Sequence, residues 1–407
     1  MSAPQTIVIA GGGFAAVNAI EALRESGYDG RIVLVSEEAA LPYDRPPLSK
    51  AYLAGTQPVE QLAFHDEAWY RGKSVDYELG QKVVSMDLGS RRVSLSGGGH
   101  VGYDRLLLVT GARARTLNGV FERAGLPLLY LRTREDADRL RAVAGPGKRV
   151  VLVGGGVIGM ETAATLAGMG SHVTVLEALD RIMARFFPPE LSAWLEAQHR
   201  SRGVDIRTRS GVDAAERTAS GAVLRLKDGA TIEADAILVG VGVVPNAELA
   251  AAAGLTIRLQ GIEVDAQART ADDHVFAAGD VAAFQDRGTW TRWENWTHAK
   301  QQGRAAANAM LGKDVSYREV PWVWSDQYDF NLQGTGSPQG DALMRGDPAS
   351  GRFTCFHLRD GRVVGATTVN EGKHKLPIRK LVELQAAVEP AKLADPGVDL
   401  KKLVASL

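Results

Sequence analysis

Short apolar runs that end at a glycine turn recur along this chain of 407 residues. Four of them, at residues 6–10, 106–109, 150–153 and 274–278, consist almost entirely of β-branched or other apolar residues. Runs without polar alternation are typical of strands buried on both faces of a parallel sheet. The alanine-rich pattern at residues 298–311 indicates a helix. Strands and helices that follow one another in this way predict an α/β fold.

Other stretches alternate between apolar and polar residues and are interrupted by glycine turns. Residues 75–106 predict a β-meander, and residues 204–244 contain further strands of this kind. Near the C-terminus, residues 353–357 and 363–368 flank an Asp-Gly pair, which is a hairpin signal. Helical patterns follow as far as Leu407, so the C-terminal part is expected to be an α+β domain.

The segment at residues 148–177 carries a complete G-x-G-x-x-G unit of strand, turn, helix and strand, and it closes on Glu177. Gly154 allows the tight turn, Gly156 lets a pyrophosphate approach the backbone, and Gly159 lets helix and strand pack closely. The N–H groups at the start of the helix then hold the phosphate charge. This pattern predicts a dinucleotide site.

The N-terminus contains an earlier copy of the same unit. Residues 11–16 read GGGFAA, so Ala16 replaces the third glycine. The second strand, at residues 32–35, leads to Glu37, which lies about twenty residues after the glycine turn, the usual spacing for a ribose-binding acid. Ser36 stands where a glycine often precedes the ribose-binding acid. One such motif is a weak signal, but two complete units in one chain predict two bound dinucleotides.

Composition narrows the possible functions. A length of 407 residues predicts two or three domains, and the net charge of −1 argues against nucleic-acid binding. The single cysteine, Cys355, excludes an internal disulfide, a Cys-ligated iron–sulfur cluster and a dithiol redox centre. No signal peptide opens the chain, and the most apolar stretch, residues 236–247, is too short to span a bilayer. We therefore expect a cytoplasmic protein without a metal site, a membrane partner or a nucleic-acid partner.

Two further segments carry charged residues whose function the pattern leaves open. The prolines of residues 42–50 hold Arg45 and Lys50 on a stiff segment beside the first nucleotide unit. Spacing alone favours the simpler interpretation, a proline loop with two solvated cations. Asp280 follows an apolar strand and a glycine, where a carboxylate accepts hydrogen bonds from sugar hydroxyls. A helix-capping aspartate is the alternative.

The two glycine units, together with the segments at Thr110-Gly111 and Gly279-Asp280, resemble the two-dinucleotide flavoproteins of the glutathione reductase type. Residues 42–50 (PYDRPPLSK), 131–133 (LRT) and 321–327 (PWVWSDQ) are similar to the NADH:ferredoxin reductases of oxygenase systems. That group includes putidaredoxin reductase, rhodocoxin reductase and the reductase components of biphenyl-type dioxygenases.

The resemblance implies an FAD-dependent ferredoxin–NAD⁺ reductase. It would pass electrons from NADH through FAD to a [2Fe-2S] ferredoxin that feeds an oxygenase of aromatic hydrocarbon catabolism. It implies two Rossmann-like domains and a C-terminal α+β domain: an FAD domain at residues 1–115 and 245–318, an NAD domain at residues 116–244, and the C-terminal domain at residues 319–407. A monomer or homodimer is expected.

The resemblance also implies roles for single residues. The residues expected at FAD are Gly11, Gly13, Phe14, Ala15, Glu37, Arg45, Lys50, Val83, Thr110, Gly111, Arg132, Gly279, Asp280, Trp296 and Trp324. Those expected at NADH are Gly154, Gly156, Val157, Ile158, Gly159, Glu161, Glu177 and Gly242. Lys50, Glu161 and Trp324 are the expected catalytic residues. Val157 stands where several relatives carry an aromatic residue that screens the flavin from nicotinamide, and this departure leaves open whether the NADH face is gated in the same way.

Two acidic residues of the segment at residues 148–177, Glu161 and Glu177, are expected to have different roles. Glu161 is expected to form an ion pair with Lys50 near the reacting end of the flavin, where it would offset the positive charge that hydride loss creates on nicotinamide; a purely structural ion pair is the alternative. Glu177 is expected to bind the ribose hydroxyls and to repel a 2′-phosphate, which favours NADH over NADPH.

Three other functions are compatible with a fold of this type. A disulfide reductase needs a redox cysteine pair, and an NADH oxidase or peroxidase needs a cysteine near residues 42–50; the sequence has neither. An FAD-binding interaction protein that resembles apoptosis-inducing factor is the alternative from another class, and the missing basic surplus argues against it.

Overall fold

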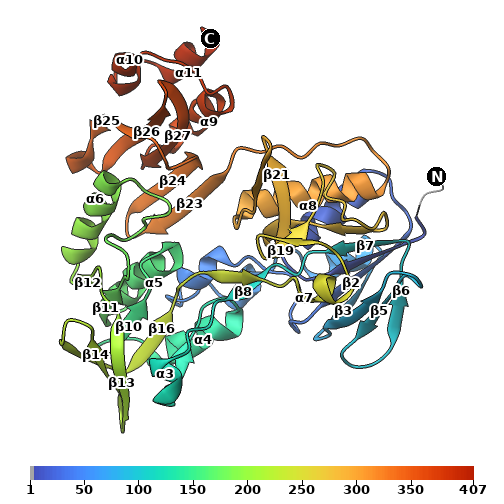
Figure 1. Ribbon diagram of the computed structural model, residues 1–407, viewed down its shortest axis with the longest axis horizontal. Coiled ribbons are helices and arrows are strands. Elements are labelled where there is room, and N and C mark those ends of the chain that lie inside the picture. The colour runs from blue at the N-terminus through green and yellow to red at the C-terminus, as the bar shows by residue number, and fades with distance from the viewer. Residues whose placement is uncertain (1–3) are drawn as a thin grey trace. The chain divides into compact units, whose positions relative to one another are not determined.

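The computed structural model describes residues 4–407 and divides them into two compact units (Figure 1). Unit 1 comprises the chain up to Asp44, Val59–Arg113 and Val243–Glu319. Unit 2 comprises Arg45–Pro58, Ala114–Gly242 and Val320–Leu407. The division into three domains stays a prediction.

Unit 1 is built on a five-stranded parallel sheet in the order β20-β7-β1-β2-β3. Its strands are β1 (Thr6–Ala10), β2 (Arg31–Ser36), β3 (Val75–Leu79), β7 (Arg105–Leu108) and β20 (Val275–Ala277). The antiparallel meander consists of β4 (Val83–Asp87), β5 (Arg92–Leu95) and β6 (His100–Gly102). Assigning residues 75–79 to the meander was therefore wrong. In the edge strand β3, Val75 is buried, Tyr77 and Leu79 are half-buried, and the two residues between them are exposed, so its periodicity resembles that of a meander strand.

Unit 2 repeats this design. Its parallel sheet has the order β9-β16-β10-β11-β12, and its antiparallel meander is β13-β14-β15. The strands are β9 (Leu128–Leu129), β10 (Arg149–Val153), β11 (His172–Leu176), β12 (Asp205–Arg207), β13 (Val212–Thr218), β14 (Gly221–Leu226), β15 (Thr231–Ala234) and β16 (Ala236–Val239). The two sheets have equivalent strand orders, so the prediction of two Rossmann-like folds is confirmed.

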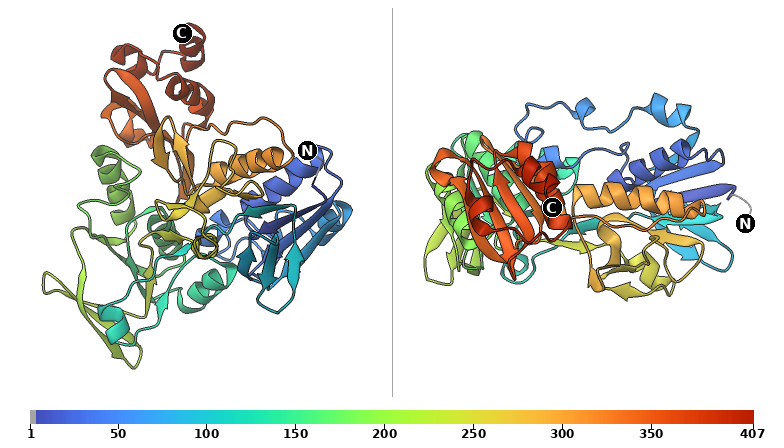
Figure 2. Two further views of the ribbon diagram at one scale, coloured as in Figure 1. Left: turned by 45° about the vertical axis from the view of Figure 1, so that its right-hand side comes forward. Right: turned by 90° about the horizontal axis from the view of Figure 1, so that it is seen from above.

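The helices that follow the glycine turns are α1 (Phe14–Glu25) in unit 1 and α5 (Val157–Gly168) in unit 2. Helix α8 (Trp296–Met310) runs beside α1 (Figure 2). The two backbones approach so closely that a β-carbon on Gly303 would lie 2.4 Å from the Ala15 carbonyl oxygen. The other elements of these two regions are η1 (Pro46–Ser49), η2 (Val59–Gln61), α2 (Glu67–Gly72), β8 (Ala112–Ala114), α3 (Val120–Arg123), α4 (Arg134–Val143), α6 (Pro189–Arg200), β17 (Val243–Pro245), α7 (Glu248–Ala252), β18 (Ile257–Arg258), β19 (Gly261–Glu263), η3 (Gly279–Val281), β21 (Ala282–Asp286) and β22 (Thr289–Thr291).

The C-terminal part of unit 2 is an antiparallel sheet in the order β23-β24-β27-β26-β25. Helices α9, α10 and α11 cover one of its faces (Figures 1 and 2). The predicted hairpin is present, and Asp360 and Gly361 at its tip have φ values of 50° and 70°. The elements are β23 (Trp322–Gln327), β24 (Phe330–Gly336), β25 (Asp341–Asp347), η4 (Pro348–Ser350), β26 (Arg352–Arg359), β27 (Arg362–Val369), η5 (Gly372–His374), α9 (Lys375–Glu383), α10 (Pro390–Ala394) and α11 (Leu400–Ala405).

The other face of this sheet shares a hydrophobic core with the parallel sheet of unit 2. Phe330 and Phe353 belong to the same buried cluster as Leu152 and Leu195, and Trp194 of α6 packs edge-on against both phenylalanines. The parallel sheet and the C-terminal sheet, although far apart in the sequence, therefore belong to the same compact unit. Within residues 4–407, none of the helices combines the length and the apolar character needed to cross a membrane.

Candidate functional site

The first glycine loop joins β1 to α1 and leaves open space at the helix N-terminus. Gly11 has a φ of 121°, and a β-carbon there would lie 2.2 Å from the Val109 carbonyl oxygen, so only glycine fits. At Gly13, a β-carbon would meet no atom within 4 Å. In the described structure, α1 has neither a side-chain cap nor an acid in its first turn. The N–H groups of this turn are therefore suited to an anion such as a pyrophosphate, which fits FAD.

Aromatic residues fix the start of α1 to the start of α8. The Phe14 ring stacks between the rings of Phe64 and Trp296, at centroid distances of 4.6 and 4.0 Å. Trp296 Nε1 also donates a hydrogen bond to Asp44 Oδ1 at 3.0 Å. Since both helices begin here, these contacts hold two positive helix ends in fixed positions within unit 1.

The remaining residues of unit 1 predicted at FAD lie at strand ends. Glu37 directly follows β2, and its carboxylate is largely exposed, with Lys82 Nζ 3.5 Å away. Val83 begins β4 and is buried. Thr110 and Gly111 follow β7. Thr110 Oγ1 donates to the Asn246 carbonyl at 2.7 Å, and the Thr110 carbonyl accepts from Asn246 Nδ2 at 2.9 Å.

The loop after β20 holds the acid predicted at the sugar hydroxyls. The N–H of Gly279 donates to Gln302 Oε1 at 2.8 Å, which ties this loop to α8. Asp280 lies inside the short turn η3, whose N-cap is Ala278. The capping alternative for Asp280 therefore finds no support, and its role at FAD stays a prediction.

The second glycine loop joins β10 to α5 and matches the first in detail. Gly154 has a φ of 112°, and a β-carbon there would lie 2.4 Å from the Gly240 carbonyl oxygen. At Gly156 a β-carbon would again meet no atom within 4 Å, and at Gly159 it would lie 2.1 Å from the Gly154 carbonyl oxygen. Helix α5 also has neither a side-chain cap nor an acid in its first turn. This loop therefore fits a second pyrophosphate.

Three further residues predicted at NADH are Val157 and Ile158, which begin α5, and Gly242, which follows β16. Ile158 is 43% exposed, whereas Val157 is partly buried and packs against the core. Gly242, after β16, has a φ of 101°, and its carbonyl accepts a hydrogen bond from the Arg115 N–H at 2.9 Å. Their contacts with NADH stay predictions.

Glu177 is anchored by the loop itself. One carboxylate oxygen accepts from the Gly155 N–H at 2.7 Å, and the other accepts from the Leu179 N–H at 2.8 Å. Each oxygen retains a further lone pair for a ribose hydroxyl. The negative charge is therefore fixed beside the loop that we expect to hold the coenzyme.

We expect the kcat/KM for NADH to exceed that for NADPH by about 100-fold, because a fixed carboxylate repels a 2′-phosphate. Steady-state kinetics with both coenzymes and one electron acceptor measure this ratio. Glu177→Gln should lower the preference below about tenfold, because the repulsive charge is lost. Comparable kcat/KM values in the unmodified protein would contradict the assignment.

Lys50 and Glu161 form the ion pair that the family resemblance implies. Lys50 Nζ lies 2.8 Å from Glu161 Oε2, and the two side chains are 18% and 3% exposed. Ser49 Oγ donates to the same oxygen at 2.6 Å, and Ser325 Oγ donates to Glu161 Oε1 at 2.8 Å. Thr165 Oγ1 of α5 donates to the Ser49 carbonyl at 2.7 Å and fixes the segment. The interpretation of residues 42–50 as a loop with solvated cations is therefore wrong for Lys50.

The sequence reasoning missed Ser49 and Ser325. Both are almost fully buried and both donate to Glu161. The only sequence signal for Ser49 is its position next to Lys50. Ser325 has no comparable signal, because its contact with Glu161 joins residues 164 positions apart.

Three further residues predicted at FAD also belong to unit 2. Arg45 donates through Nη1 to the Arg132 carbonyl at 2.5 Å, which joins the proline segment to the start of α4. Trp324 of β23 stacks on Trp322, with ring centroids 5.1 Å apart. Their contacts with FAD stay predictions.

Cys355 is not available for redox chemistry. It lies on β26 in the core of unit 2 with no exposed surface, and burial raises the pKa of its thiol to about 12. A buried thiol with a raised pKa does not supply the thiolate that disulfide exchange and peroxide reduction require. This geometry argues against the cysteine-dependent alternatives.

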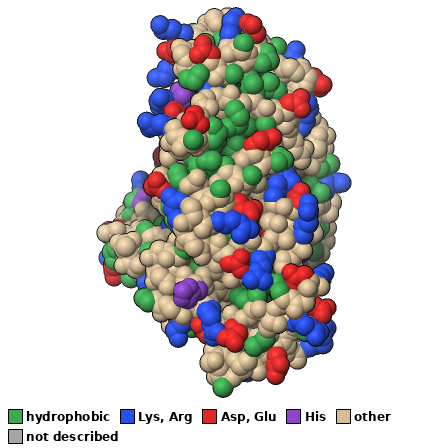
Figure 3. All heavy atoms as spheres, turned by 90° about the vertical axis from the view of Figure 1, so that its left-hand side faces the viewer, with side chains coloured by type: hydrophobic (Ala, Val, Ile, Leu, Met, Phe, Trp, Pro, Cys, Tyr) green, Lys and Arg blue, Asp and Glu red, His purple; other side chains and the backbone are tan. Residues whose placement is uncertain are grey.

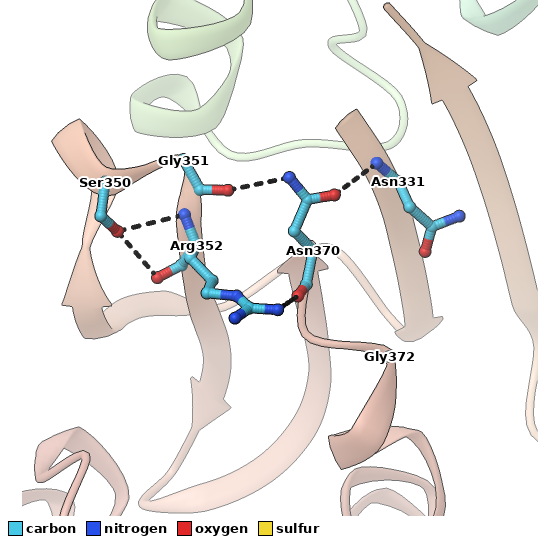
Figure 4. A pocket seen from close by; sticks show the side chains of 6 residues that line it. All are labelled: Asn331, Ser350, Gly351, Arg352, Asn370 and Gly372. Atoms are coloured by element: carbon cyan, nitrogen blue, oxygen red, sulfur yellow. Dashed lines mark hydrogen bonds between the residues drawn. The ribbon is translucent and has the colours of Figure 1, made fainter. Parts of the chain in front are cut away.

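A surface hollow lies at the edge of the C-terminal sheet, and none of the predicted site residues lines it. Figure 4 shows Asn370 directed between Gly351 and Asn331. Its Nδ2 donates to the Gly351 carbonyl at 3.1 Å, and its Oδ1 accepts from the Asn331 N–H at 2.8 Å. These polar groups hold the hollow itself together, so we assign no ligand to it.

Comparison with known proteins agrees with the two-loop geometry. The family model described as pyridine nucleotide-disulphide oxidoreductase matches residues 5–303. The chain belongs to this family. A second model, described as reductase C-terminal, matches residues 322–404, which contain the antiparallel sheet.

Individual members of the family are similar over nearly the whole chain. The ferredoxin–NAD⁺ reductase component of the anthranilate 1,2-dioxygenase system of Burkholderia cepacia is 41% identical and covers 97% of this chain and 98% of its own length. The ferredoxin reductase for the CYP199A2 system of Rhodopseudomonas palustris has a TM-score of 0.94 at 37% identity, with 98% and 100% coverage. Putidaredoxin reductase, in its covalent complex with putidaredoxin, has a TM-score of 0.93 at 36% identity, with 100% and 99% coverage.

Proposed function

We propose that this protein is an FAD-dependent ferredoxin–NAD⁺ reductase that passes electrons from NADH to a [2Fe-2S] ferredoxin, which in turn feeds an oxygenase. The observation that carries the proposal is the pair of equivalent glycine loops in one chain, each with open space at an uncapped helix N-terminus. The similar proteins named above are reductases of ferredoxins in oxygenase systems, which supports the choice of electron acceptor. The cytoplasmic location predicted from the sequence is part of this proposal.

The chain's own residues would hold the two cofactors and set the charge around them. When bound, FAD accepts two electrons from NADH and releases them singly, which suits a one-electron acceptor. Gly11 and Gly13 would let the FAD pyrophosphate approach the start of α1, and Gly154 and Gly156 would do the same for NADH at α5. Glu161 would then supply negative charge, held in place by its three donors.

The face of the protein drawn in Figure 3 has no large patch of side chains of a single charge. Basic and acidic side chains are interspersed there, in keeping with a net charge of −1. A nucleic-acid-binding face would gather lysine and arginine into a stripe. No such stripe lies on the face that Figure 3 draws.

Anaerobic titration of the purified holoprotein with NADH tests the proposal. We expect the flavin absorbance to bleach with about one equivalent of NADH and to return only when oxidised ferredoxin is added, because FAD accepts electrons in pairs and releases them singly. A stable bleached complex that ferredoxin does not reoxidise would favour an NADH-controlled binding protein instead. Rapid reoxidation by dioxygen alone would indicate an oxidase.

A further inference from the structure

A buried chain of hydrogen bonds connects Glu161 to the C-terminal sheet and then to α6. Ser325 Oγ donates to Glu161 Oε1 at 2.8 Å, and Gln327 Nε2 donates to Ser325 Oγ at 2.9 Å. His199 Nε2 lies 2.8 Å from Gln327 Oε1, and the Tyr328 hydroxyl lies 2.9 Å from His199 Nδ1. The three middle residues are at most 3% exposed.

Only one direction of hydrogen-bond donation along this chain of hydrogen bonds gives every group a suitable donor or acceptor. Burial lowers the pKa of His199 to about 4, so the ring is neutral near pH 7 and one nitrogen donates while the other accepts. If Nε2 donates to Gln327, Tyr328 donates to Nδ1, and every later bond points toward Glu161. The opposite direction requires Glu161 to donate to Ser325. Lys50 and Ser49 favour the acceptor form of Glu161, so they select the first direction.

The members of the chain come from three elements of unit 2. Glu161 lies on α5, Ser325 and Gln327 lie on β23, and His199 lies at the end of α6. Figure 1 shows α6 beside the C-terminal sheet, and the shared core fixes this arrangement. At the outer end, the guanidinium of Arg202 lies 4.5 Å from the Tyr328 ring centroid. The chain therefore spans the packing between the nucleotide-binding part and the C-terminal sheet.

We propose that Ser325, Gln327 and His199 are positioning residues that hold Glu161 Oε1 as a fixed hydrogen-bond acceptor toward the nicotinamide site. The proposal rests on the role given to Glu161 in the proposed function. Bonds aligned head to tail polarise one another, so each donor strengthens the next. Because the Gln327 amide is a poor carrier of protons, the chain orients the carboxylate and does not conduct protons. The C-terminal sheet thus contributes to the hydride step through these buried groups.

Gln327→Met tests the proposal because methionine fills a similar volume but has no donor toward Ser325 and only a weak acceptor toward His199. In stopped-flow reduction of the holoprotein by saturating NADH, we expect about a tenfold lower rate constant, by analogy with the lower end of the effect of removing an outer-shell partner at a metal site. FAD content and the apparent Kd for NADH should stay within about twofold, since those contacts lie elsewhere. His199→Gln should remain within about threefold of the unmodified rate, because its amide keeps a donor toward Gln327.

The matched control is His357→Met. His357 lies on β26 of the same sheet, is equally buried, and also has a pKa lowered to about 4, but it bonds Thr367 and not this chain. We expect His357→Met to change thermal stability without changing the rate of flavin reduction. An equal slowing in His357→Met would overturn the proposal, because the effect would then be general to the sheet. An unchanged rate in Gln327→Met would overturn it directly.

Ser325→Ala is a second test at the same link in the chain of hydrogen bonds. If Gln327→Met does not fold, Ser325→Ala removes a single oxygen at the same link; a slowing of about tenfold supports the proposal, and an unmodified rate overturns it. Failure of the proposed function looks different from either result. In that case the unmodified protein would itself show no flavin bleaching with NADH.

Discussion

Glu161→Gln is expected to slow reduction of the bound flavin by NADH about 100-fold, in the range found when a preorganised electrostatic group is removed from an active site. Glutamine keeps the shape of the side chain but loses its charge, and its amide group faces donors at Lys50, Ser49 and Ser325. Stopped-flow absorbance under anaerobic conditions measures the reduction step, and NAD⁺ release is followed separately. Unchanged rates for both steps would show that the ion pair has only a structural role.

The same change separates stability from catalysis. Breaking a buried ion pair by removing one partner destabilises a protein by about 3–5 kcal/mol, and the partial exposure of Lys50 places the expected loss at the lower end of this range. The double variant Lys50→Met with Glu161→Gln removes the uncompensated charge as well. We expect chemical denaturation to show recovered stability in the double variant while flavin reduction stays slow.

Gly13→Ala and Gly156→Ala are each expected to weaken the binding of a different cofactor in a protein that remains folded. A β-carbon at either position meets no protein atom within 4 Å, so it enters only the space that a pyrophosphate needs. Gly13→Ala should be purified largely without flavin. Gly156→Ala should retain flavin but show an NADH Kd raised by about 100-fold, since the backbone can no longer approach the phosphates.

Gly159→Ala provides the contrasting control for this pair. Its β-carbon would lie 2.1 Å from the Gly154 carbonyl oxygen, so the helix and its preceding strand must separate. We expect a loss of about 1–3 kcal/mol in the free energy of unfolding, as for other overpacked sites. If Gly13→Ala loses NADH affinity and keeps its flavin, the assignment of the two loops is reversed.

Local patterns in the sequence were sufficient to predict most of the fold. The strand–glycine–helix units at Gly11 and Gly154 were visible because apolar runs, turn residues and small-residue helices all have short periods. The Asp360-Gly361 hairpin was visible for the same reason. In contrast, β3 was misassigned, because an edge strand of a parallel sheet has the same alternation as a strand of an antiparallel meander.

Long-range polar contacts were beyond reach of these patterns. His199 and Gln327 are 128 residues apart, and their contact depends on how α6 packs against the C-terminal sheet. Nothing in the sequence near either residue indicates this pairing. The ion pair between Lys50 and Glu161 was predicted only through resemblance to a known group of proteins, since residue type and spacing alone did not distinguish Lys50 from a solvated cation.

During synthesis from the N-terminus, the parallel sheet of unit 2 is completed before the parallel sheet of unit 1. All strands of the second sheet lie between Leu128 and Val239, whereas the first sheet needs β20, which ends at Ala277. Helix α8, which packs on α1, ends still later, at Met310. Unit 1 begins first in the sequence. Its parallel sheet nevertheless cannot be completed on the ribosome until every strand of the parallel sheet of unit 2 has been synthesised.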